Sequence, residues 1–213
     1  MPRAEALAVK DDRFIAVGTS SDILNLASSG SEIIDAEGMT VTPGFIDAHS
    51  HPSSGGVNEL VQVNADLRSV VEIKEAIAER ARNTPRGQRV RAFKYDDTKL
   101  DEGRPINRFD LDEAAPENPV VVGHRGGHTG VYNSMALAMA GVTAETPDPD
   151  DGRFYRDDNG VLTGLVAEKA RDVFRDLIPS DSNREERREG IKLISQLMTA
   201  AGLTSVHQTG GSR

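Results

Sequence analysis

The sequence predicts an α/β fold: a partial (β/α) TIM-type barrel with about four of the eight strands, preceded by a small β segment. Helical patterns alternate with strand patterns along the chain, and this alternation is typical of a parallel sheet. A closed barrel needs eight strands and about 250 residues, whereas this chain has 213 residues. The four strand candidates are near residues 41–48, 89–95, 119–124 and 203–208.

The N-terminal part, residues 1–42, is interpreted as a separate β segment, and residues 43–213 as the incomplete barrel. Two short apolar runs on either side of the polar turn 10–13 predict a hairpin. A short helix capped by Ser21 and Asp22 is expected next. Two further strands are expected at 32–36 and 39–41, with a Glu-Gly turn between them.

The composition excludes several classes of function. The net charge is −9 and aromatic residues make up 4% of the chain, so neither a nucleic-acid partner nor an anionic membrane is expected. The chain has no cysteine, which excludes disulfides, thiolate metal ligands and a cysteine nucleophile. No apolar run approaches the roughly 20 residues that span a bilayer, and no signal-peptide pattern is visible. We therefore expect a cytoplasmic protein.

The stretch 41–52 carries the strongest candidate for chemistry. Its apolar part, 41–48, predicts a buried strand. Pro52 and the Ser-Ser-Gly-Gly run 53–56 end this strand. Alternation along a strand places Asp47, His49 and His51 on one side. Two imidazoles two residues apart can bind one metal ion, such as Zn, Fe, Ni or Mn. Alternatively, the two histidines are solvated surface residues, since a His-x-His pair also occurs by chance.

Two capping signals mark the central helices. Ser69 with Glu72 predicts the start of a helix that runs to about Arg82, and Asp110 with Glu113 predicts a shorter helix. Each helix stands directly before a strand candidate, as the alternating pattern of an α/β fold requires.

Polar residues stand at the carboxyl ends of the next two strands. Lys94 ends strand 89–95 and is expected either to extend along apolar surface or to face a substrate. His124 ends strand 119–124, and His128 follows across a glycine-rich turn. In the simpler interpretation, one of these histidines satisfies backbone groups and the other is exposed.

The last third of the chain contains a hairpin, a long helix and a strand. An Asn-Gly turn predicts a hairpin over 153–163, and a helix that includes Glu168 is expected to start at Gly164. Asn183 is expected to cap a helix that ends near Ala201. Strand 203–208 follows and has His207 near its carboxyl end.

Several blocks of the sequence, in order, resemble the amidohydrolase superfamily. Residues 43–51 (PGFIDAHSH) are similar to the first-strand signature of that family, and residues 33–41 to its lead-in. Residues 111–121, 127–137 and 160–168 resemble its type 3 members, the N-substituted formamide deformylase-like proteins. The resemblance covers nearly the whole chain.

The resemblance implies a metal-dependent hydrolase of carbon–nitrogen bonds other than peptide bonds, with an amide or formamide substrate. It implies one or two divalent ions, zinc foremost, that activate a water. The implied site residues are the metal ligands His49, His51 and Glu168, the substrate contact His128, and Asp47, which would support an imidazole. Lys94 and His207 are predicted as further substrate contacts from their positions near strand ends. In many relatives a carboxylated lysine bridges two metals, but it comes from later in the barrel than Lys94.

In the family, later strands bring two more histidines and an aspartate that acts as general acid/base, and the sequence contains none of them. We therefore expect a truncated chain that is inactive alone. In the family an N-terminal β segment pairs with a C-terminal one to form a sandwich, of which residues 1–42 would be half. Exposed barrel edges would favour homo-oligomers.

Three alternatives stay open. Glu168 is equally well explained as a surface acid on a helix, paired with a nearby base such as Lys169 or Arg171. The whole chain is alternatively a non-catalytic half-barrel or an interaction module. A metallophosphoesterase is the third alternative, because the pattern Asp-x-His-x-His also serves in that class.

Overall fold

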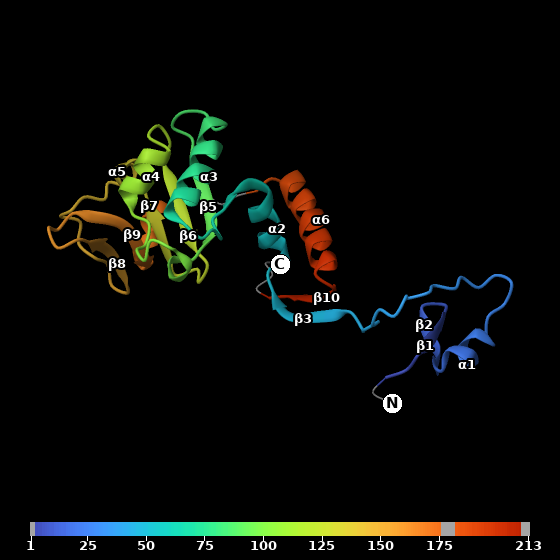
Figure 1. The fold of residues 1–213 in the computed structure, drawn as a ribbon. Coiled ribbons are helices and arrows are strands. Elements are labelled where there is room, and N and C mark those ends of the chain that lie inside the picture. Colours follow the sequence, from blue (N-terminus) through green and yellow to red (C-terminus); the bar gives the residue numbers. More distant parts are fainter. Residues whose placement is uncertain (1–2, 176–181, 210–213) are drawn as a thin grey trace. The chain divides into compact units, whose positions relative to one another are not determined.

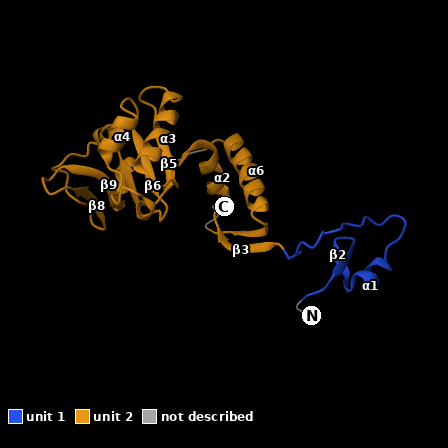
Figure 2. Cartoon of the chain, viewed as in Figure 1, with its two compact units in different colours: residues 1–43 blue, residues 44–213 orange. Residues whose placement is uncertain are grey.

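A computed structural model describes residues 3–175 and 182–209 (Figure 1). The chain forms two compact units, Met1–Pro43 and Gly44–Arg213 (Figure 2). No helix within the described ranges is both long and apolar enough to cross a bilayer.

The first unit contains a hairpin and one short helix. Strands β1 (Ala6–Lys10) and β2 (Arg13–Gly18) pair antiparallel, which confirms the predicted hairpin. Helix α1 (Ser20–Leu24) begins two residues earlier than expected. The reason is that the hydroxyl of Thr19 accepts the hydrogen bond from the Asp22 amide, at 3.2 Å, and so caps the helix.

The two strands expected at 32–36 and 39–41 are not formed. The turn between them is present, because the Met39 amide donates to the Ala36 carbonyl oxygen at 2.8 Å. The flanking segments have no strand partner among the described residues, and Ile34 is 81% exposed. Alternating apolar residues predict a strand only where a neighbouring strand completes the hydrogen bonds, and here none does.

A parallel strand pair with a very long connection begins the second unit. Strands β3 (Phe45–Ser50) and β10 (Leu203–Gln208) are neighbours. Helices α2 (Pro52–Val61) and α6 (Arg184–Ala200) follow the first strand and precede the second, and they lie side by side (Figure 1). The expectation of a buried strand at 41–48 is wrong in both respects: the strand starts at Phe45, and Phe45 is 64% exposed. With β10 as its one strand neighbour in the described ranges, β3 has little to bury it.

The chain between α2 and α6 forms a mixed six-stranded sheet in the order β4-β5-β6-β7-β9-β8. The first three strands are parallel and the others antiparallel. The strands are β4 (Val63–Asn64), β5 (Val90–Tyr95), β6 (Val120–His124), β7 (Thr129–Tyr132), β8 (Gly152–Arg156) and β9 (Leu162–Glu168).

Both faces of this sheet are covered. Val120 and Val122 of β6 pack into one core with α3 (Val70–Arg82) and α4 (Arg108–Ala114). Val121 points the other way, as alternation requires, and joins a second core. That core includes α5 (Ser134–Met139) and the 3₁₀ helix η2 (Lys169–Phe174). A short 3₁₀ helix η1 (Asp97–Lys99) follows β5.

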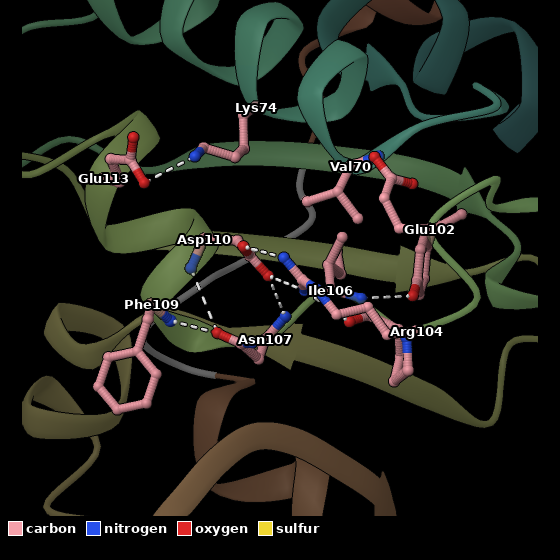
Figure 3. Close-up of polar contacts among 11 residues, drawn as sticks. Val70, Lys74, Glu102, Arg104, Ile106, Asn107, Phe109, Asp110 and Glu113 are labelled. Atoms are coloured by element: carbon pink, nitrogen blue, oxygen red, sulfur yellow. Dashed lines mark hydrogen bonds and ion pairs between the residues drawn. The ribbon is translucent and has the colours of Figure 1, made fainter.

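The capping predictions had mixed outcomes. Ser69 and Glu72 form the predicted capping box of α3, and Asn183 caps α6. The box predicted from Asp110 and Glu113 is wrong: α4 starts three residues earlier, with a box between Asn107 and Asp110 (Figure 3). Asn107 is as good a cap as Asp110, and Arg104 holds the Asp110 carboxylate with two hydrogen bonds of 2.8 Å.

The helix predicted from Gly164 is also wrong, because residues 162–168 form strand β9 between β7 and β8. The α/β class is confirmed, with a different arrangement of the four expected strands. Two of them pair as β3 and β10, and the other two as β5 and β6 in the six-stranded sheet.

Candidate metal site at the carboxyl end of β3

The imidazoles of His49 and His51 lie next to each other at the end of β3. Their ring centroids are 5.6 Å apart, with the ring planes nearly perpendicular at 83°. Both side chains are exposed. His49 lies in β3, and His51 follows the strand as the residue before α2. The separation of the two rings allows both to approach one ion.

A backbone contact from β10 fixes the orientation of His51. Nδ1 of His51 lies 2.8 Å from the carbonyl oxygen of Thr209. A carbonyl oxygen can only accept, so Nδ1 is the donor. In the neutral ring Nε2 then carries the lone pair, which is the arrangement that metal-binding histidines use. The Thr209 hydroxyl lies 3.4 Å from this nitrogen and donates to the Ser50 carbonyl oxygen at 3.1 Å.

Further hydrogen bonds join the ends of the two strands to the start of α2. The Ser50 hydroxyl donates to the His207 carbonyl oxygen at 3.1 Å. The side-chain oxygen of Gln208 accepts from both the amide and the hydroxyl of Ser53, at 3.2 and 3.0 Å. His207 thus lies on the strand adjacent to the histidine pair, and its backbone, rather than its ring, makes the described contact.

Asp47 makes a local contact instead of the expected support of an imidazole. Its Oδ1 accepts from the His49 backbone amide at 3.0 Å. The carboxylate therefore holds the backbone between Asp47 and His49, and no described hydrogen bond connects it to either ring.

Glu168 lies in a different pair. Its Oε1 is 2.9 Å from Nδ1 of His128, and its amide donates to the His128 carbonyl oxygen at 2.9 Å. Both side chains are more than half exposed. Glu168 has a φ of 50°, which is unusual for a residue with a side chain. His49, His51 and Glu168 do not form a three-ligand cluster in the described part of the chain, so the structure does not bring the expected metal set together.

Lys94 pairs with Glu59 of α2, and its ammonium group lies 5.1 Å from the centre of the Phe93 ring. Its φ is 64°, in the left-handed region. The β5–β6 register shifts between Ala92 and Tyr95, which brackets this residue. The contacts described for Lys94 are thus with Glu59 and Phe93, and none is with the histidine pair.

One cluster of metal-binding residue types was missed in the sequence. Atoms of Asp96, Asp97 and His124 lie within 4.8 Å of one another, the one such trio in the described ranges. The signal was available: two aspartates follow β5, His124 ends β6, and adjacent parallel strands bring their carboxyl ends together.

The hydrogen bonds of this trio favour a satisfied polar network over a metal site. Nδ1 of His124 accepts from the Gly126 amide at 3.0 Å, so the neutral ring carries its proton on Nε2, 3.2 Å from Asp97. Asp96 accepts from Thr98 at 2.6 Å and from Arg125 at 2.9 Å. These hydrogen bonds, that of Thr98 foremost, hold the pKa of Asp96 far below its usual range.

Comparison with known proteins identifies the family to which the chain belongs. Residues 32–213 match the sequence model of a family described as "Amidohydrolase family". N-substituted formamide deformylase of Arthrobacter pascens is 34% identical over 95% of the chain and 38% of its own length. Protein LONG AFTER FAR-RED 3 of Arabidopsis thaliana is 29% identical over 99% of the chain and 36% of its own length.

A solved structure has a similar fold. An uncharacterised metal-dependent hydrolase from Pyrococcus furiosus aligns over 94% of the chain and 39% of its own, with 29% identity and a TM-score of 0.54. The chain therefore spans less than half the length of each of these proteins.

Proposed function

The chain belongs to the amidohydrolase family, and from this premise we propose that it carries part of the metal site of a hydrolase that cleaves carbon–nitrogen bonds other than peptide bonds. The observation that carries the proposal is the histidine pair at the carboxyl end of β3. Its two rings are adjacent, and the Thr209 carbonyl orients His51 so that the lone pair of the neutral ring is on Nε2.

The donor set fits a divalent ion, and zinc is the proposed one. Neutral imidazole nitrogen is a preferred zinc ligand, and two imidazoles make half of a tetrahedral set. When bound, such an ion polarises a substrate carbonyl and lowers the pKa of a water molecule. His49 and His51 would hold it, while Asp47 accepts from the His49 backbone amide and so holds the backbone that leads into His49.

We further propose that β3 and β10 are adjacent strands of a (β/α) barrel. Their parallel pairing and their connection through two packed helices support this, because parallel neighbours in a barrel are joined through helices. The histidines stand at the carboxyl end of the first of these strands, the edge at which barrel enzymes place their chemistry.

The substrate class is a proposal from the relatives. N-substituted formamide deformylase is 34% identical, so an amide or formamide of a small molecule is the substrate to test first. The chain spans 38% of that relative, and the expected general acid/base lies on strands of the family that the chain does not match. We therefore propose that the 213-residue chain binds metal but does not turn over.

Metal analysis of the full chain tests the proposal. The chain, stripped of metal with a chelator and dialysed against zinc, is expected to retain zinc in stoichiometric amount. His49→Ala and His51→Ala should each reduce the zinc retained, while His128→Ala, which removes a histidine outside the pair, should not. Equal retention by all four proteins would contradict the site. Hydrolysis of an N-substituted formamide by the chain alone would contradict only its inactivity.

A further inference from the structure

A cavity lies among residues other than the histidine pair. It has a volume of about 210 Å³ and lies among α2, the end of α3, the start of β5 and the segment that leads into α6. None of its lining residues is one of the candidate site residues discussed above. Figure 1 shows that these elements meet where the helix pair adjoins the six-stranded sheet.

Three arginines line this cavity: Arg80 from α3, Arg89 from the position just before β5, and Arg91 from the second position of β5. Within residues 3–175 and 182–209, no carboxylate lies within 4.0 Å of their guanidinium groups. Burial, and then the positive charge of Arg89, lower the pKa of Arg91. Like charges thus face one space in a chain whose net charge is −9.

The other polar groups of the cavity also favour an anion. Asn58 uses its side-chain oxygen to accept from Gln62 at 2.6 Å, which leaves its amide hydrogens as donors toward the cavity. Ser182 adds a hydroxyl. Glu186 is the one acid in the lining, and its carboxylate already accepts from the Asn183 amide at 2.9 Å in the capping box of α6.

We propose that this cavity binds a small phosphate-bearing anion. Guanidinium groups match phosphate oxygens with paired, charge-assisted hydrogen bonds. The cavity is smaller than the roughly 300–1,000 Å³ typical of drug-sized ligands, which suits an inorganic phosphate or a small phosphate ester. Such an anion would contact α2, α3 and β5 together, and so tie the helix pair to the sheet.

Titration of the full chain with inorganic phosphate, at constant ionic strength against chloride, tests this proposal. Isothermal calorimetry should detect saturable binding. Arg89→Gln should weaken it by about tenfold or more, the usual effect of removing one charged hydrogen-bond donor. Arg86→Gln is the matched control, because Arg86 is an exposed arginine that pairs with Glu117 outside the cavity.

A third variant changes the affinity in the opposite direction. Glu186→Gln keeps a capping side chain at the same place in α6 but removes the one negative charge of the lining. Phosphate should then bind more tightly than to the wild type. Absence of saturable binding would overturn the proposal, and so would equal weakening by Arg89→Gln and Arg86→Gln or weaker binding by Glu186→Gln. All three substitutions lie on partly or fully exposed positions, and circular dichroism verifies that each variant is folded.

Discussion

Nδ1 of His51 donates to the carbonyl oxygen of Thr209, a residue 158 positions away in the chain. This bond joins the end of β3 to the end of β10 at the proposed metal site. The geometry of one of the two proposed metal ligands therefore depends on the pairing of these two strands, and substitutions that separate the strands should also weaken metal binding.

Gly44→Ala tests this dependence. A methyl group at Gly44 would lie 2.1 Å from the Cγ2 atom of Thr204 on β10, so β3 must move. We expect a loss of about 1–3 kcal/mol of stability and weaker zinc binding, measured by denaturant unfolding and metal analysis. Gly44→Ala combined with Thr204→Gly should recover both. Gly30→Ala, where the methyl group meets nothing within 4 Å, is the control, and an equal effect there would refute the argument.

The close contact between α2 and α6 is the subject of the second prediction. A methyl group on Gly190 would lie 2.7 Å from the Val57 nitrogen and 2.8 Å from a Gly56 carbon, both backbone atoms that cannot move aside. Gly190→Ala should therefore destabilise the chain by roughly 2 kcal/mol or more. Gly55→Ala, on the open side of α2, should instead be neutral or stabilise by up to about 1 kcal/mol. Thermal unfolding of both variants decides the matter.

The third prediction concerns acid sensitivity at Asp110, a buried carboxylate at the start of α4. Burial alone would raise its pKa, but the hydrogen bonds from Arg104 and the Asn107 amide outweigh burial and lower it. A lowered pKa in the folded state means that the carboxylate stabilises the fold above its unfolded pKa of about 4. That contribution is lost as the pH falls through the lower folded value.

Asp110→Asn should remove this acid-dependent part and cost about 1–2 kcal/mol at neutral pH. Denaturant unfolding at pH 7 and pH 3 measures this contribution. The free energy of unfolding of the wild type should fall more between pH 7 and pH 3 than that of the variant. Glu113→Gln, which breaks the more exposed pair with Lys74 (Figure 3), should cost under about 1 kcal/mol. Parallel pH curves for wild type and Asp110→Asn would contradict the assignment.

The backbone of Glu168 is the subject of the fourth prediction. With φ at 50° and ψ at −129°, a side chain is strained there, and glycine is not. Glu168→Gly should therefore be more stable than Glu168→Gln, by about 1 kcal/mol, although both remove the exposed carboxylate that contacts Nδ1 of His128. Thermal unfolding of the two variants gives the comparison. A more stable glutamine variant would show that the backbone is not strained.

Local signals in the sequence predicted the parts of the fold that are local. The capping box at Ser69 and Glu72 and the adjacent rings of His49 and His51 follow from spacing within a few residues. The strand partner of β3 could not be predicted in this way. Its contact residue Thr209 is 158 positions from His51 in the sequence, and all six strands of the larger sheet lie between them. Glu168 was assigned to a helix because β9 derives its strand conformation from neighbours on both sides, which the local sequence does not show.

The long excursion between β3 and β10 also sets an order of events during synthesis. Ribosomes add about 5–20 residues per second, so His51 leaves the ribosome many seconds before Thr209. In that interval the six-stranded sheet has time to fold through its own contacts. The strand that pairs with β3, next to the two histidines, has not yet been synthesised. The proposed metal site is thus among the last features to form, and a nascent chain interrupted before β10 would present two imidazoles without the carbonyl that orients one of them.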